Sequence, residues 1–258
     1  MIGQGHVFTI SVFTEISDAL RSVNCRLRGV SDCCLLGANG EDGLARRMAA
    51  SNMPFLLALL AGGSFYATLW FAVDPLLHTI WKGAGVGLLA VWAATKARRT
   101  DQWLIATALG LGALGDVLLE ASGLTVGAIA FLGGHIAATT MYLRNGAAPM
   151  AWAAGVAAGV SILATGPSPA PGIALYALGL GAMCGSNWVS RFPVIAKAGA
   201  ALFVTSDLLL VAELGPLRNS PVPGLLIWPT YFAGQALIAW GVVCTLAGET
   251  RESLHHRL

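Results

Sequence analysis

Polar and ionisable side chains interrupt several long apolar segments of this sequence. They are His78, Lys82, Asp116, Glu120, His135, Lys197, Asp207, Tyr231 and Gln235. An ionisable group in the hydrocarbon core of a bilayer is costly, so it normally faces a protein interior or a water-filled cavity and marks a functional site. Asp116 and Asp207 have side chains too short to reach the membrane surface easily. These two aspartates are therefore the first candidates for chemistry.

Two aspartates in one pocket of low polarity can divide the work of acid–base catalysis. Burial favours the protonated form of a carboxyl group, whereas a neighbouring ammonium such as that of Lys82 favours the ionised form. The protonated aspartate could then give a proton to the substrate, while the ionised one stabilises an oxocarbenium-like cation or activates water. This pattern indicates cleavage of an acetal-like bond. Ester hydrolysis fits less well, because the sequence has no G-x-S-x-G nucleophile elbow.

Helical spacing groups the polar residues. Three pairs are four residues apart: His78 and Lys82, Asp116 and Glu120, and Tyr231 and Gln235. Residues at this spacing share one helix face. Counting about 1.5 Å per residue from the predicted helix ends places four polar groups roughly 9 to 11 Å below the same, non-cytoplasmic, membrane surface. These four are Lys82, Asp116, Asp207 and Tyr231. We therefore expect one polar pocket inside the helix bundle.

Structural roles are the alternative for several of these residues. Glu120 lies at a predicted helix end and could face the headgroup region, and His135 could simply hydrogen-bond a neighbouring helix. Either aspartate could form an ion pair with Lys82 that only holds helices together. A metal ion would have to draw on Asp116, Asp207 and His135, but the sequence has no H-E-x-x-H motif or clustered His spacing around them. The prediction is therefore a site without a metal ion or a cofactor, and dependence on a metal stays open at this point.

Eight apolar stretches must position these side chains. They are approximately residues 54–73, 76–95, 102–120, 124–143, 150–165, 170–189, 194–212 and 224–246. Stretches of roughly 17 to 23 residues are long enough to cross about 30 Å of hydrocarbon as helices. The prediction is an all-α integral membrane protein, a bundle of eight transmembrane helices.

The distribution of basic residues predicts the orientation of the bundle. Arg46, Arg47, Lys96, Arg98, Arg99, Arg144, Arg191, Arg251 and Arg257 all fall near the termini or in even-numbered loops. Among the opposite loops only Arg218 is basic. Basic loops stay on the cytoplasmic side, so both termini are predicted to be cytoplasmic. An even number of spans, such as eight, puts both termini on one side and so agrees with this orientation.

Composition supports a membrane class. Hydrophobic residues make up 56% and charged residues 11% of the chain, whereas soluble domains carry about 25% charged residues. The net charge of +2 predicts no nucleic-acid partner. Residues 1–50 form a predicted, loosely ordered N-terminal extension, 51–248 the membrane domain and 249–258 a short cytoplasmic tail. The Ala- and Gly-rich composition suits a bacterial inner membrane.

The order of motifs along the chain resembles the YhhN-type lysoplasmalogenase family. The matching residues are Gly115, Asp116 and Leu119 in the third stretch, Phe131, Gly134 and His135 in the fourth, Gly199, Ala200, Phe203, Ser206 and Asp207 in the seventh, and Tyr231, Phe232 and Gln235 in the eighth. The resemblance covers about residues 54–247. It departs from the family pattern at Gly83, where a Pro is expected shortly after the second-helix Lys, and over the N-terminal 50 residues, which have no family counterpart.

The resemblance implies an eight-helix membrane hydrolase. Such enzymes cleave the vinyl-ether bond of lysoplasmalogens, single-chain phospholipids, to release a fatty aldehyde and a glycerophospho-ethanolamine or glycerophospho-choline. Asp116 and Asp207 match the two acidic positions of the family. Four further residues match its accompanying polar positions: Lys82, His135, Tyr231 and Gln235.

Vinyl-ether chemistry agrees with the two-carboxylate interpretation. Proton transfer to the β-carbon creates an oxocarbenium ion, which water captures as a hemiacetal that collapses to aldehyde and alcohol. We predict that Asp116, which shares a face with Glu120, donates the proton and that Asp207 is the base, and the reverse assignment remains open. Lys82 could bind the lipid phosphate, and Tyr231 with Gln235 could hold glycerol oxygens or water.

Two other functions remain open at this point. Buried carboxylates with a Lys also occur in proton-coupled transporters, although the predicted helices are uninterrupted and no inverted repeat is evident. A non-catalytic lipid-binding membrane protein is the other alternative.

Overall fold

The computed structural model describes residues 42–146, 151–165 and 170–255. The chain divides into two compact units, Met1–Ala45 and Arg46–Leu258. The second unit contains all the described residues except those at the start of the first helix. Residues 1–41 of the predicted N-terminal extension lie outside the described part of the chain.

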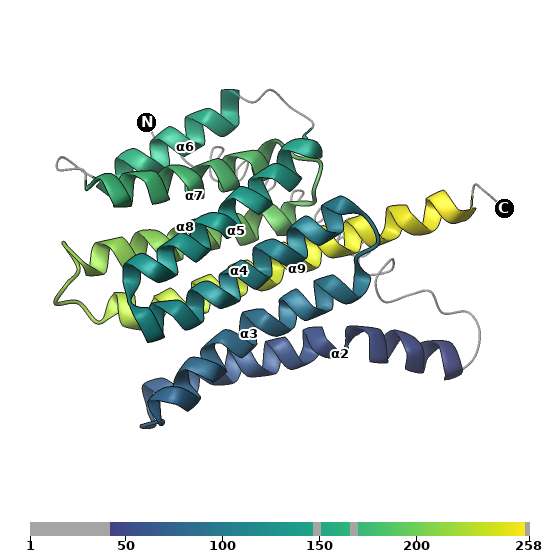
Figure 1. The fold of residues 1–258 in the computed structure, drawn as a ribbon, viewed down its shortest axis with the longest axis horizontal. Coiled ribbons are helices and arrows are strands. Elements are labelled where there is room, and N and C mark those ends of the chain that lie inside the picture. Colours follow the sequence, from purple (N-terminus) through teal and green to yellow (C-terminus); the bar gives the residue numbers. More distant parts are fainter. Residues whose placement is uncertain (1–41, 147–150, 166–169, 256–258) are drawn as a thin grey trace, which may run out of the picture. The chain divides into compact units, whose positions relative to one another are not determined.

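The regular elements of the described ranges are helices. They are α2 (Asp42–Phe65), the short 3-10 helix η1 (Tyr66–Leu69), α3 (Pro75–Lys96), α4 (Thr100–Ser122), α5 (Leu124–Arg144), α6 (Ala151–Thr165), α7 (Pro171–Val189), α8 (Val194–Glu213) and α9 (Val222–His255) (Figure 1). Each of the eight predicted stretches corresponds to one of the helices α2 to α9, which confirms the all-helical prediction.

Seven of these helices are long and apolar enough to cross a membrane. The exception within the described residues is α6, whose 15 residues extend over about 22 Å, less than the roughly 30 Å of a hydrocarbon core. The chain is a multi-pass helical membrane protein.

Two helices, α2 and α9, extend well beyond or stop well short of their predicted bounds. Helix α2 begins at Asp42, inside the stretch assigned to the extension, and ends at Phe65 rather than near residue 73. The chain continues as η1 to Leu69, and Asp74 then caps α3 by accepting hydrogen bonds from the backbone N–H groups of Leu76 and Leu77 at 3.0 and 3.2 Å. Helix α9 continues beyond residue 246 to His255.

A one-residue turn joins α4 to α5. Gly123 adopts a positive φ of 87°, a conformation that glycine tolerates better than other residues. The two helices therefore return antiparallel to each other and pack along their length (Figure 1). This hairpin brings the polar residues of α4 and α5 to the same side of the bundle.

Helices α8 and α9 form the second close pair. A Cβ atom at Gly199 would lie 2.7 Å from the Gly234 carbonyl oxygen, and one at Gly234 would lie 2.8 Å from that of Gly199. Only small residues allow two backbones to approach this closely. Asp207 and Tyr231 lie on the same side of this crossing point, since the helices run in opposite directions. Helix α9 also packs against α3 and α4, and α7 packs against α5, α6 and α8.

Candidate active site

The main cavity of the bundle has a volume of about 400 Å³ and lies among α3, α4, α5, α7, α8 and α9. Its polar lining residues are Lys82, Asp116, Thr125, Tyr176, Ser206, Asp207 and Tyr231. Most of the remaining lining is aliphatic, contributed by α5, α7 and α8. This volume falls within the range of about 300–1,000 Å³ that is typical of small-molecule sites. The four residues expected at one depth thus line one cavity.

Asp116 is held by a tyrosine from α9. The Tyr231 hydroxyl donates to Asp116 Oδ2 at 2.8 Å, and both residues are buried. Gln235, one turn further along α9, lies beside this hydroxyl: a Cβ atom at Gly112 would lie 3.2 Å from Gln235 Nε2 and 3.7 Å from the Tyr231 hydroxyl oxygen. Asp116 therefore ends a chain of three side chains, Gln235–Tyr231–Asp116.

Asp207 is held in the same way by a different helix. The Tyr176 hydroxyl of α7 donates to Asp207 Oδ2 at 2.7 Å. His135 Nε2 of α5 lies 3.3 Å from the same hydroxyl, and its ring packs against Phe203 with ring centroids 5.4 Å apart. His135, Tyr176 and Asp207 therefore form a second chain of three side chains.

Lys82 pairs with Glu120 and with neither aspartate. The Lys82 ammonium lies 2.5 Å from Glu120 Oε1, and both side chains are partly exposed. An ion pair between Lys82 and a buried aspartate, the structural alternative from the sequence, is therefore not formed. Since Lys82 also lines the main cavity, the pair places a cation and an anion at one end of it.

His78 stands apart from the other candidates. Its ring packs against Phe65 of α2 with centroids 4.8 Å apart, and it lines neither cavity. The i, i+4 spacing puts His78 and Lys82 on one face of α3, but only Lys82 lines the main cavity.

The opposite end of the main cavity faces the surroundings of the bundle. Three of its aliphatic lining residues, Ile129, Leu175 and Leu214, have exposed fractions of 67%, 59% and 56%. In a membrane protein such residues contact lipid chains. The cavity thus combines Lys82, both aspartates and an aliphatic wall, part of which borders the bilayer.

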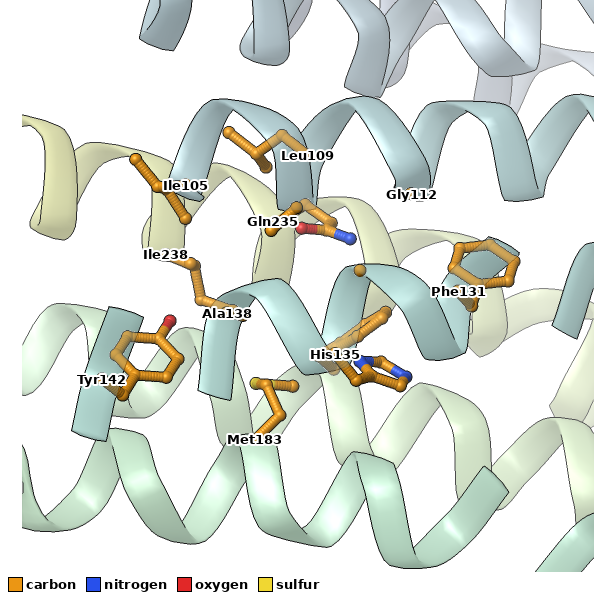
Figure 2. Close-up of a pocket in the computed structure, with 13 residues that line it drawn as sticks. Ile105, Leu109, Gly112, Phe131, His135, Ala138, Tyr142, Met183, Gln235 and Ile238 are labelled. Carbon is orange, nitrogen blue, oxygen red and sulfur yellow. The ribbon is translucent and has the colours of Figure 1, made fainter. Parts of the chain in front are cut away.

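The bundle also contains a second, much smaller cavity of about 30 Å³, and Figure 2 shows the residues that line it. His135 of α5 and Gln235 of α9 both line it, and Phe131 lines both cavities. A Cβ atom at Gly112 would lie 3.2 Å from Gln235 Nε2, so the absence of a side chain there leaves room for the amide.

Tyr176 lines the main cavity and holds Asp207, but the sequence interpretation did not select it. It lies six residues after residue 170, the predicted start of its span, or about 9 Å below the surface at 1.5 Å per residue. The depth count that selected the other four groups would have selected Tyr176 as well. Within the described residues, no group of three or more His, Cys, Asp or Glu side chains could hold a metal ion.

Comparison with protein families matches residues 77–242 to the YhhN family. No curated protein and no solved structure matches the chain. The matched region contains both aspartates, both tyrosines, the Lys82–Glu120 pair and the lining of both cavities. The chain therefore belongs to the YhhN family, the lysoplasmalogenase family that its motifs resemble.

Proposed function

We propose that this protein hydrolyses the vinyl-ether bond of lysoplasmalogens within the membrane. The observation that carries the proposal is that two buried aspartates from different helices open on one largely aliphatic cavity. Each aspartate has one oxygen fixed by a tyrosine, so its other oxygen can act on a bound substrate. Membership of the YhhN family supports the same activity.

The reaction uses the two carboxyl groups in turn. A protonated aspartate gives its proton to the β-carbon of the vinyl ether, and the electron pair of the double bond forms the new C–H bond. Water then adds to the resulting oxocarbenium carbon and loses a proton to the second, ionised aspartate. Proton transfer from that aspartate to the glycerol oxygen, and from the hemiacetal hydroxyl to the first, breaks the C–O bond and restores both carboxyl groups.

The cavity and its border offer a group for each chemical part of a single-chain phospholipid. Lys82 at one end offers an ammonium for the phosphate, and Glu120 beside it offers a carboxylate for an ethanolamine or choline cation. The two aspartates line the same cavity and would meet the vinyl ether. The aliphatic residues of α5, α7 and α8 then accommodate the hydrocarbon chain, which extends toward the bilayer past Ile129 and Leu175.

We also propose a membrane and an orientation for this protein. A bacterial inner membrane, with both termini in the cytoplasm, would place the cavity in the outer half of the bilayer, where the headgroup of a lysolipid lies near the surface. Labelling of single cysteines introduced next to Arg144 and Arg218 in intact cells tests this placement. We expect only the Arg218 side to react with an impermeant reagent, and reaction at Arg144 alone would reverse the orientation.

Aldehyde release by the detergent-purified protein tests the activity. We expect release from a lysoplasmalogen and none from the matched ester-linked lysolipid. An enzyme needs no sealed compartment, whereas a transporter does. Folded protein that releases no aldehyde, but moves protons or lipid across sealed vesicles, would contradict the proposal. Folded protein that only binds lysolipid would instead indicate a lipid-binding role.

A further inference from the structure

The two hydrogen-bonded chains that hold the aspartates end at one place. The first runs Asp116–Tyr231–Gln235 and the second runs Asp207–Tyr176–His135. Gln235 and His135, the last members, come from different helices, yet both line the small cavity (Figure 2). Both residues are more than nine-tenths buried.

Each chain ends in a hydrogen-bond acceptor. Tyr231 donates its hydroxyl hydrogen to Asp116, and its oxygen has the amide nitrogen of Gln235 as a neighbour beside Gly112. With that N–H turned toward Tyr231, Gln235 Oε1 is left as an acceptor. Tyr176 donates to Asp207, so its oxygen accepts from His135 Nε2–H. A neutral imidazole with its hydrogen on Nε2 has an acceptor at Nδ1.

The small cavity has the size and the lining that one water molecule needs. Its volume of about 30 Å³ exceeds the roughly 10–15 Å³ that a water requires by this measure, and a buried water needs two to four polar partners. Tyr142 adds a third polar residue to the lining. A water has two hydrogens to donate, one for each chain.

We propose that the small cavity binds one water molecule that donates to both Gln235 and His135 and so joins the two chains behind the active site. This inference rests on the proposed function for its catalytic meaning. Gln235 and His135 are then positioning residues: through the tyrosines they fix the two carboxyl groups in the orientation that the reaction needs. Loss of the water, Gln235 or His135 then loosens the hold on both carboxyl groups, although each keeps its direct bond from a tyrosine.

Gln235→Met and His135→Phe test the connection, alone and combined, because each removes hydrogen bonding at similar size. We expect each single variant to lower kcat about tenfold, with the pH profile of kcat changed in the same direction in both. The double variant should be no slower than the slower single one, since either break interrupts the same connection. A hundredfold loss in the double variant, the product of independent effects, would overturn the proposal.

A cavity-filling variant tests the water itself and leaves every polar side chain in place. Ala138 lines the small cavity and is buried, so Ala138→Val should displace the water and reproduce the tenfold loss in kcat. Ala137→Val, one residue earlier and outside both cavities, is the matched control and should keep the wild-type rate. Wild-type kcat in Ala138→Val would overturn the proposal.

Thermal stability separates this inference from the proposed function. If the wild-type protein releases no aldehyde, the proposed function fails. The shared water is then tested by measuring the midpoint of thermal unfolding of the wild type, Gln235→Met, His135→Phe and the double variant. Shifts that combine to less than their sum support the shared water. Shifts that add fully overturn it, whatever the activity.

Discussion

The two cavities of the bundle meet at Phe131 but differ in size, lining and role. The large one, of about 400 Å³, has aliphatic walls and both carboxyl groups, whereas the small one, of about 30 Å³, has the far ends of the two hydrogen-bonded chains. The large cavity can hold a lipid and the small one only a water. Residues of the large cavity should therefore act on the substrate directly, and residues of the small one through their neighbours.

The largest effect is expected at the carboxyl groups. Asp116→Asn and Asp207→Asn keep the size of the side chain but remove its ability to give or take a proton. Each should lower kcat for aldehyde release by roughly a thousandfold, within the range of about 10²–10⁴ for general acid–base groups. Unchanged helicity and lysolipid binding are the control. Near-normal turnover in either variant would remove that aspartate from the reaction.

Lys82 should affect substrate binding more than the rate of the chemical step. A charged hydrogen bond to phosphate is worth about tenfold to hundredfold in affinity, so Lys82→Met should raise KM by that factor. An alkenyl glycerol that lacks the phosphate is the control substrate, and its KM should not change. Equal losses with both substrates would show that the Lys82–Glu120 pair only holds α3 and α4 together.

The tyrosines should have intermediate effects that do not depend on the substrate. Tyr176→Phe and Tyr231→Phe each remove one hydrogen bond to a carboxylate, and kcat should fall about tenfold for every lysoplasmalogen tested. Steady-state kinetics with two headgroups and two chain lengths measure this. A loss confined to one substrate would instead place the hydroxyl in contact with the lipid.

The smallest effect is expected from the aliphatic wall. Ala128 lines the large cavity on α5, so Ala128→Leu should raise KM roughly threefold to tenfold for long-chain substrates through overpacking. A short-chain substrate should be affected less. Ala137→Leu, on the same helix and outside both cavities, is the matched control. Equal effects on long and short chains would mean that the hydrocarbon chain lies elsewhere.

Much of this architecture could be predicted from the sequence because a bilayer restricts the choices. The length of the apolar stretches fixed the helices, and counting from their ends placed Lys82, Asp116, Asp207 and Tyr231 at the level where one cavity contains them all. The same count reaches Tyr176, which a search for ionisable residues alone passes over.

Other features depend on how helices pack, which periodicity does not report. The spacing of His78 and Lys82 predicts a shared face but not that the cavity reaches only Lys82. The position of Glu120 at a helix end did not predict that Lys82 would form its ion pair with Glu120 and not with an aspartate. The small cavity depends on the room left by Gly112 between α4 and α9, and only three-dimensional packing shows it.

Hydrolysis in water enriched in the heavy isotope of oxygen tests the central claim most directly. If an aspartate protonates the vinyl ether and water attacks the oxocarbenium carbon, the bond between that carbon and the glycerol oxygen breaks. The glycerophospho-ethanolamine product should then contain only ordinary oxygen, as mass spectrometry of that product would show. Heavy oxygen in its glycerol hydroxyl would mean that the glycerol C–O bond breaks instead, and would contradict the account.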